Sequence, residues 1–284
     1  MFIFFFGLHS HAHTKHTTQD IKVKALIVSP NIKLLKKTVD VFKRIELKSG
    51  GHIGIVIPKR TEEASSSFSI SSEGRDVLPR VYEGGLALWE CALDLVSFMD
   101  ESSDIIPKDS NVLELGCGFG LPGIWTLLRG CKRCVFQDLN ADVLASATSQ
   151  HVLANMNASA FSSSRCSLVA GDWFDDALMK LIRSESTRDD GMYDLIITAE
   201  TLYTPALVSR LFFMLDNLLS SSSDRSLAIV ASKRYYFGTG LGGGTSLLLS
   251  MCDRKGSKLS AKVVRVLEDG ASNIREVLLI RRRE

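Results

Sequence analysis

The sequence predicts an α/β fold in which a mostly parallel sheet of seven strands carries helices on both faces and ends in an antiparallel hairpin. Between residues 111 and 232, short apolar runs with the length of buried strands alternate with longer segments of helical periodicity. Two further apolar runs, 262–266 and 275–280, are separated by the turn signal Asp269-Gly270. These last runs are expected to pair with each other and to close the sheet.

The individual elements follow from periodicity, taken in chain order. The first helix comes after Pro79 and has apolar residues at helical spacing from Leu88 to Met99. Pro122 lies near the start of the next helix, where proline is common. Because strands alternate with helices, right-handed crossovers should make the strands parallel. The predicted strands are 111–115, 133–138, 167–170, 193–198 and 226–232, and the later helices are 121–128, 142–156 and 206–219.

Residues 1–75 are predicted to be a partly disordered N-terminal extension, and residues 76–284 the main domain. Alternating isoleucines at 53, 55 and 57 indicate a short strand within the extension, and the Ser- and Glu-rich stretch 61–76 is typical of a linker. The apolar start, 1–8, follows no basic residue and is shorter than a signal peptide or a bilayer span requires.

Charge and cysteine content narrow the possible functions. With 34 basic and 32 acidic residues the net charge is +2, so we expect no dedicated nucleic-acid surface. The six cysteines are dispersed through apolar segments, as in proteins of a reducing compartment. Cys131 and Cys134 form a lone pair, whereas a zinc site needs further ligands. No metal site is therefore predicted.

The most informative motif is the glycine-rich stretch 112–123, which follows the first strand of the main domain. Gly116, Gly118 and Gly120 can adopt positive φ and allow the backbone to approach a ligand closely. In open α/β sheets, ligands bind at this carboxyl end of the strands. The glycine spacing alone is shared with dinucleotide-binding oxidoreductases, so the neighbouring acids decide the interpretation.

Two carboxylates flank this loop in the predicted fold. Glu114 lies inside the end of the first strand, where it can hold a cationic amino group, and its alternative role is to accept hydrogen bonds from the loop amides. Asp138 ends the second strand, where a carboxylate can accept both ribose hydroxyls of an adenosine. This pair favours an adenosine ligand that carries an amino group.

The ends of the later strands add further candidates. Gly171-Asp172-Trp173 follows the third strand, where an acid and an aromatic ring can bond to adenine and stack on it, or form a turn with a core tryptophan. The stretch Thr-Ala-Glu-Thr-Leu-Tyr-Thr-Pro occupies 198–205, after the fourth strand. Basic and aromatic residues at 231–238 precede a glycine-rich segment and are either a substrate lip or a connector.

These motifs, together with Tyr-Glu-Gly-Gly-Leu-Ala-Leu-Trp-Glu-Cys at 82–91 and Phe-Gln-Asp-Leu-Asn at 136–140, occur in order and at matching intervals. Over residues 76–284 the chain resembles the eukaryotic histidine protein methyltransferases, relatives of the small lysine-directed methyltransferases. The resemblance implies a class I methyltransferase (Rossmann-like) sheet that binds S-adenosyl-L-methionine. One departure is Ala199, because the family usually has serine before the glutamate of this motif.

The resemblance also implies a cofactor pocket that includes the segment around Trp89 and Glu90. With the residues chosen above, the predicted cofactor-binding set is Ala87, Leu88, Trp89, Glu90, Cys91, Glu114, Gly116, Gly118, Gln137, Asp138, Leu139, Gly171, Asp172, Trp173 and Ala199. The implied substrate is a histidine of a large-subunit ribosomal protein. Ribosomal proteins of this kind are present in the cytoplasm and nucleus, so we expect the enzyme there. The lack of an export signal in the sequence supports the same expectation.

Methyl transfer to nitrogen depends mainly on alignment of the reactants. An imidazole, with a pKa of about 6.5, is mostly neutral in the cell, whereas a lysine, with a pKa of about 10.4, must first lose a proton. We predict that Glu200 accepts the N–H of the imidazole nitrogen that is not methylated and that Tyr203 lines the same channel.

Three alternatives remain at this point. A lysine-directed protein methyltransferase of the same branch is one, and a non-catalytic cofactor-binding relative is another, because of Ala199. The third is a dinucleotide-binding oxidoreductase, which Glu114 before the loop and the closing hairpin disfavour.

Overall fold

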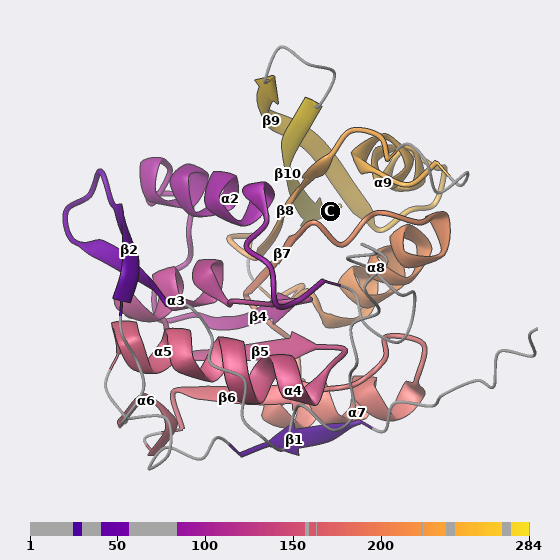
Figure 1. Cartoon of the computed structure of the whole chain (residues 1–284). Helices are drawn as coiled ribbons and strands as arrows, with labels where there is room; N and C mark the ends of the chain where they lie inside the picture. Colours follow the sequence, from indigo (N-terminus) through magenta and orange to yellow (C-terminus); the bar gives the residue numbers. More distant parts are fainter. Residues whose placement is uncertain are drawn as a thin grey trace, which may run out of the picture.

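The computed structural model describes residues 25–29, 41–56, 84–156, 159–162, 164–222, 224–236, 242–268 and 274–283. Within these residues one eight-stranded sheet crosses the molecule in the order β1-β6-β5-β4-β7-β8-β10-β9, with helices on either side (Figure 1). The predicted linker 61–76 and the apolar start 1–8 lie outside the described residues.

Seven of these strands are the seven predicted from the sequence. The central five run parallel, and the last two form the antiparallel hairpin beside β8. The remaining strand, β1 (Leu26–Val28), adds an antiparallel edge next to β6. The bounds of the seven are β4 (Asn111–Leu115), β5 (Arg133–Asp138), β6 (Cys166–Ala170), β7 (Leu195–Ala199), β8 (Leu227–Lys233), β9 (Leu259–Glu268) and β10 (Ile274–Arg282).

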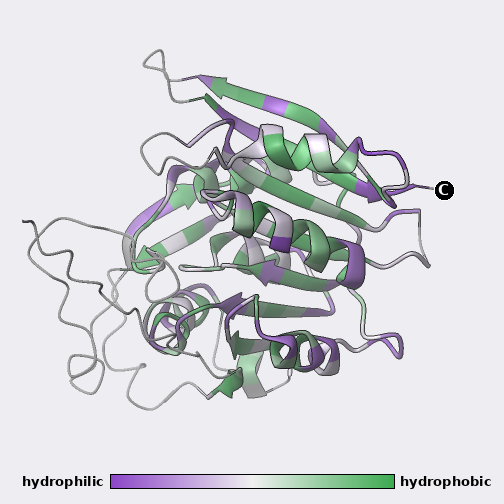
Figure 2. Cartoon of the chain, turned by 90° about the vertical axis from the view of Figure 1, so that its right-hand side faces the viewer, coloured by the Kyte–Doolittle hydropathy of each residue, from purple (hydrophilic) through white to green (hydrophobic). Residues whose placement is uncertain are grey.

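The central strands are apolar on both sides because helices cover both faces, as a parallel sheet requires. One buried cluster joins the sheet to α2 (Glu90–Glu101), α3 (Leu121–Leu128) and α5 (Ser149–Asn155). The other joins it to α7 (Asp176–Glu185), α8 (Pro205–Leu218) and α9 (Thr245–Cys252). Figure 2 shows the hydrophobic strands between these layers. The short α6 (Ser159–Ser162) precedes β6.

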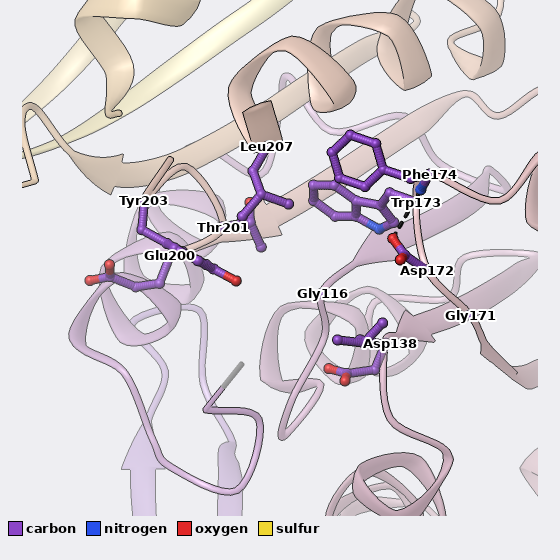
Figure 3. Close-up of a pocket in the computed structure, with 11 residues that line it drawn as sticks. Gly116, Asp138, Gly171, Asp172, Trp173, Phe174, Glu200, Thr201, Tyr203 and Leu207 are labelled. Atoms are coloured by element: carbon purple, nitrogen blue, oxygen red, sulfur yellow. Dashed lines mark hydrogen bonds between the residues drawn. The ribbon is translucent and has the colours of Figure 1, made fainter. Parts of the chain in front are cut away.

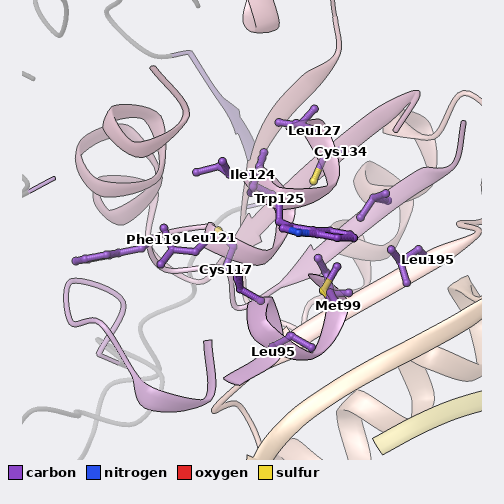
Figure 4. Close-up of a cluster of buried hydrophobic side chains, with 14 of the residues drawn as sticks. Leu95, Met99, Cys117, Phe119, Leu121, Ile124, Trp125, Leu127, Cys134 and Leu195 are labelled. Carbon is purple, nitrogen blue, oxygen red and sulfur yellow. The ribbon is translucent and has the colours of Figure 1, made fainter. Parts of the chain in front are cut away.

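The first cluster surrounds the buried Trp125, which Figure 4 shows among side chains of α2, α3 and the strands. Its indole N–H donates to Asp100 Oδ1 over 3.1 Å, so the one polar atom of this ring is paired within the core. This contact fixes α2 against α3, and α2 in turn leads to the site described below.

The predicted helix 142–156 is confirmed, with an irregularity in its middle. It consists of α4 (Ala141–Val143), the π-helical turn η2 (Leu144–Thr148) and α5. Such turns are rare and lie mostly inside longer helices. The sequence interpretation missed the short α6 and also α7 and α9, and the last two cover the opposite face. For α7 the signal was present, since Asp175 caps its start and Leu178 and Ile182 repeat at helical spacing.

Part of the predicted N-terminal extension packs onto the domain. The hairpin of β2 (Val41–Glu46) and β3 (His52–Val56) lies against α5, where the Val56 amide donates to His151 Nε2 over 3.2 Å. At its turn the Ser49 amide donates to Asp100 Oδ2 over 3.0 Å. The described parts of residues 1–75 therefore pack onto the domain, β1 as an edge strand of the sheet and the hairpin against α5.

His151 makes the stability of this region depend on pH. Burial lowers its pKa from 6.5 to about 4, against the opposing effect of its hydrogen bond to Ala147. The unfolded chain therefore binds a proton more readily, and the free energy of unfolding should rise with pH between about 4 and 6.5. The fall of this pKa from 6.5 to about 4 corresponds to about 3 kcal/mol in the free energy of unfolding.

Urea unfolding at several pH values tests this expectation. We expect His151→Gln, which cannot titrate, to flatten the profile across this window while keeping an acceptor for the Val56 amide. Parallel profiles of the wild type and the variant would assign the pH dependence to other groups.

Candidate functional site

A pocket opens at the carboxyl ends of β6, β5, β4 and β7, the edge where open α/β sheets bind ligands. Figure 3 shows Glu200 and Tyr203 at one end and Asp138, Asp172 and Trp173 at the other. The complete lining is Gly116, Asp138, Leu139, Gly171, Asp172, Trp173, Phe174, Glu200, Thr201, Tyr203 and Leu207. The fold therefore brings both predicted catalytic residues and six predicted cofactor-binding residues into one cavity.

Three lining residues were missed by the sequence interpretation. Phe174 and Thr201 directly follow predicted residues in the chain, so their neighbourhood was a usable signal. Leu207 lies in the first turn of α8 and reaches the pocket only because that helix packs beside the loop after β7. Periodicity alone could not have found it.

The glycine loop after β4 is tightly packed at its first glycine. Gly116 has a φ of +61°, and a Cβ added there would lie 2.5 Å from Thr201 Cγ2. The loop is held from below, since the Cys117 amide donates to the Gln137 carbonyl over 2.9 Å. A side chain at 116 would thus push the loop away from the Glu200–Tyr203 segment.

We expect Gly116→Ala to weaken both the fold and ligand binding at this pocket. The left-handed backbone costs about 1–2 kcal/mol for an alanine, and the contact with Thr201 adds to it. Gly130→Ala is the matched control, because Gly130 has a φ of +86° but no atom within 4 Å of the added Cβ. The midpoint temperature of thermal unfolding should fall more for Gly116→Ala than for Gly130→Ala. Equal falls in the two variants would show that the structure accommodates the contact with Thr201 without losing stability.

Asp138 occupies the predicted position at the end of β5. Its Oδ2 accepts the Gly118 amide over 3.0 Å and its Oδ1 accepts the Asn140 amide over 3.1 Å. The carboxylate is 6% exposed and lines the pocket. Carboxylate oxygens accept more than one hydrogen bond each, so these amide bonds are compatible with the predicted contact to ribose hydroxyls.

Gln137 supports the pocket from beneath and does not line it. Its side chain is fully buried, with Oε1 accepting the Trp173 indole N–H over 2.6 Å and Nε2 donating to the Gly171 carbonyl over 2.9 Å. The Gly116 amide lies 3.4 Å from the same Oε1. One amide side chain therefore ties the glycine loop to the end of β6 and sets the orientation of Trp173.

Glu114 takes the alternative role named for it above. Its carboxylate is 2% exposed and accepts the Gly123 amide over 2.9 Å, beneath the start of α3. Burial raises the pKa of this carboxyl well above its usual range, which disfavours the charge needed to hold a cationic amino group. The geometry thus gives Glu114 a supporting function for the loop, and it does not line the pocket.

The segment around the start of α2 also lies outside the pocket lining. The Trp89 indole N–H donates to the Gly84 carbonyl over 3.0 Å, and Glu90 is exposed beside Arg275, 3.1 Å away. Cys91 is buried and faces Glu200. The predicted residues that do not line the pocket are Ala87, Leu88, Trp89, Glu90, Cys91, Glu114, Gly118, Gln137 and Ala199.

The loop after β7 carries the end of the pocket that contains Glu200 and Tyr203, the predicted catalytic residues. Thr198 at the end of β7 donates to the Leu115 carbonyl over 2.7 Å and contacts the Thr201 hydroxyl at 2.8 Å. Between them Glu200 has a φ of +57°, a left-handed conformation that few residues other than glycine adopt. Strain of this kind persists where surrounding contacts hold it and often marks functional positions.

Glu200 is held by two side chains from different elements. The Tyr236 hydroxyl, beyond β8, donates to Glu200 Oε2, and the Cys91 thiol at the start of α2 donates to the same carboxylate. Burial, and then the charge of Glu200, raises the pKa of both Tyr236 and Cys91, so both remain uncharged donors. Tyr236 was not predicted as a site residue, although the stretch 231–238 was singled out.

Other site types find no support in the described parts of the chain. There, no three His, Cys, Asp or Glu side chains are grouped so that they could bind a metal ion. No helix among the same residues has both the length and the apolar character needed to traverse a bilayer. All six cysteines are buried free thiols.

A parallel five-stranded sheet with a C-terminal antiparallel hairpin, a glycine loop after its first strand and an acid after its second define a class I methyltransferase. The chain belongs to the family described as lysine methyltransferase, whose model matches residues 80–237, more than half of the 284 residues. A putative S-adenosylmethionine-dependent methyltransferase from Streptococcus mutans aligns with a TM-score of 0.43 at 18% identity, over 66% of this chain and 47% of that one. The fold assignment rests on the strand order.

Similar curated proteins include enzymes named for two different acceptors. The histidine protein methyltransferase 1 homolog of Dictyostelium discoideum is 39% identical over 210 residues, covering 72% of this chain and 60% of that protein. The homolog of Rattus norvegicus is 34% identical over 225 residues, covering 72% and 58%. The protein N-lysine methyltransferase METTL21A of Xenopus tropicalis is 26% identical over 186 residues, covering 64% and 77%. The chain thus spans about 60% of the length of the histidine-directed relatives.

Methyltransferases of this family use S-adenosyl-L-methionine. The lining suits that molecule, because Gly116 presents its backbone without a side chain at the end of β4 and Asp138 provides a carboxylate at the wall. A buried aromatic ring, Trp173, lies beside Asp172 at the same end. An adenosine needs both kinds of contact, polar for the ribose and flat apolar for the base.

Proposed function

We propose that this chain is an S-adenosylmethionine-dependent protein methyltransferase that modifies a histidine side chain. The observation that carries the proposal is the carboxylate of Glu200, which lines the pocket and accepts hydrogen bonds from the uncharged Tyr236 and Cys91. Neither of these donors is a cation, so neither forms an ion pair with the carboxylate. Similarity to histidine protein methyltransferase homologs supports the same acceptor.

The cofactor would occupy the end of the pocket formed after β5 and β6. Asp138 would accept the ribose hydroxyls, and Leu139, Asp172 and Trp173 would surround the adenine. The segment containing Ala87–Cys91 would border this end, because a Cβ at Gly85 would lie 3.4 Å from Asp138 Oδ2. When bound, S-adenosylmethionine supplies an electrophilic methyl group and retains the electrons of the broken bond on sulfur.

The acceptor would enter at the end formed by Glu200 and Tyr203. A neutral imidazole presents a lone pair on one nitrogen and an N–H on the other. Glu200 would accept that N–H, which directs the lone pair toward the methyl donor. The imidazole becomes positively charged as the new bond forms, and the nearby carboxylate stabilises this charge and takes the N–H proton on its way to solvent.

A lysine acceptor is the second candidate, favoured by the family description and by the similarity to METTL21A. A lysine must lose a proton before it has a lone pair, and a carboxylate at this position stabilises the protonated ammonium. The same residue that aligns an imidazole therefore opposes the reaction of a lysine. The site chemistry favours histidine for this reason.

We further propose that the acceptor histidine belongs to a large-subunit ribosomal protein, and that the enzyme acts in the cytoplasm and nucleus, where such proteins are made and assembled. This proposal follows from the motif resemblance over residues 76–284.

The test is transfer from a tritium-labelled donor to large-subunit ribosomal proteins, followed by hydrolysis and amino-acid analysis. We expect label in methylhistidine, located to one residue by mass spectrometry. Label in methyllysine would replace the proposal with the lysine alternative. Binding of S-adenosylhomocysteine without transfer to any of these proteins would favour a different substrate or a non-catalytic relative.

A further inference from the structure

We propose that Tyr236 is a positioning residue that holds the Glu200 carboxylate in the orientation the acceptor requires. This inference rests on the proposed function for its catalytic consequence. Tyr236 does not line the pocket and so acts through Glu200. Its hydroxyl is the donor that reaches the carboxylate from the sheet side, from just beyond β8.

The hydroxyl contacts form a short chain that determines which group donates. The Tyr236 hydroxyl donates to Glu200 Oε2, so the Ser232 hydroxyl, 2.9 Å from the Tyr236 oxygen, donates to Tyr236. Ser232 is fully buried within β8. The chain thus extends from the interior of the sheet to the pocket wall. A buried chain of this kind is costly to leave incomplete, because polar atoms would then lose a hydrogen bond in a region of low dielectric.

Glu200 is fixed at two further points. Its amide donates to the Ala231 carbonyl of β8 over 3.0 Å, which anchors the backbone in its left-handed conformation. The Cys91 thiol donates to its carboxylate from α2. With backbone and carboxylate both held, the side chain has little freedom. The loss of Tyr236 would remove one of the two donors and let the carboxylate turn.

The ring of Tyr236 has packing contacts that a phenylalanine would preserve. Its centroid lies 6.4 Å from that of Tyr203 in an edge-to-face arrangement, and the Lys233 ammonium lies 5.7 Å from it. Tyr236→Phe therefore removes the hydroxyl and retains the ring. The contact between the Lys233 ammonium and the ring is also retained in this variant.

A double-mutant cycle on kcat tests the positioning role. We expect Tyr236→Phe to lower kcat about 10-fold with the KM for the cofactor unchanged. In a Glu200→Gln background the same substitution should change kcat less than about 2-fold, because the group it positions is gone. Independent, multiplicative effects of the two substitutions, or a loss of S-adenosylhomocysteine affinity in Tyr236→Phe, would overturn the proposal.

Tyr193→Phe is the matched control. Tyr193 is also buried, and its hydroxyl donates to the Ile182 carbonyl over 2.6 Å, away from the pocket. Its loss should lower thermal stability but leave kcat unchanged. A similar fall of kcat in both variants would assign the effect of Tyr236→Phe to general destabilisation and overturn the proposal.

Proton NMR of tyrosine-labelled protein tests the contact without any substrate. A hydroxyl that donates to a carboxylate should give a slowly exchanging downfield signal, assigned by its loss in Tyr236→Phe and shifted by Glu200→Gln. If the chemical shift of this hydroxyl proton were the same in Glu200→Gln as in the wild type, the proposal would be overturned, even for an active enzyme. Absence of methyl transfer by the wild type would instead refute the proposed function, while the hydroxyl signal would still decide whether Tyr236 holds Glu200.

Discussion

Glu200→Gln should lower kcat for methyl transfer by about 10²-fold or more, the range expected for loss of a positioned proton acceptor. The substitution keeps the size of the side chain and one oxygen, but it removes the charge that, in the proposed mechanism, would stabilise the developing imidazolium. It also places an amide beside the Tyr236 hydroxyl and the Cys91 thiol in place of the carboxylate that accepts from both. The measurement is single-turnover transfer of labelled methyl to the acceptor protein.

Affinity for S-adenosylhomocysteine should change less than about 2-fold in this variant, because Glu200 lies at the opposite end of the pocket from Asp138 and Trp173. Glu46→Gln is the control, since Glu46 is exposed on β2 and has the same chemistry. A large loss of cofactor binding with transfer intact at saturation would move Glu200 into the cofactor site and remove its assigned role.

Asp138→Ala is expected to weaken S-adenosylhomocysteine binding by about 100-fold or more. Hydrogen bonds to a charged group contribute about 1.5–3 kcal/mol each, and in the proposed site two ribose hydroxyls would depend on this carboxylate. The substitution also deprives the Gly118 amide of its acceptor, which loosens the glycine loop itself. Calorimetric titration of the ligand into wild type and variant measures the difference directly.

The control for this experiment is Asp224→Ala, which removes one exposed carboxylate far along the chain from the pocket. It should leave the affinity unchanged, because the hydrogen bond recorded for Asp224 uses its backbone carbonyl. Unaltered binding in Asp138→Ala would place the ribose elsewhere. Failure of the wild-type protein to bind S-adenosylhomocysteine would contradict the assignment of the pocket to this cofactor.

The sequence was most informative where a single element determines the position of a residue. Asp138 and Gly171-Asp172-Trp173 follow directly on buried strands, and the carboxyl ends of adjacent parallel strands meet at one edge. Strand positions and the shared edge were therefore predictable from apolar runs and turn residues. The same reasoning placed Gln137 and Glu114 near the edge, but it could not show that both side chains turn inward and support the loop from below.

Contacts between segments that are distant in the sequence could not be predicted from strand positions and turn residues. Cys91 and Tyr236 are separated by more than a hundred residues. Both reach Glu200 only because α2 packs on the sheet beside β8, which Tyr236 follows. Leu207 enters the pocket by the docking of α8, and the hairpin β2–β3 meets α5 through His151. None of these pairs leaves a local pattern of spacing.

By itself, then, the sequence determined the strand order along the chain, the closing hairpin, the glycine loop and the edge at which a ligand binds. These depend on backbone propensity and on the period of apolar residues, which act over a few neighbouring positions. The tertiary structure alone decided which side of each strand end faces the pocket and which donors hold Glu200. Those features depend on side-chain packing between elements far apart in the chain, where a rotation of one residue exchanges a ligand contact for a structural one.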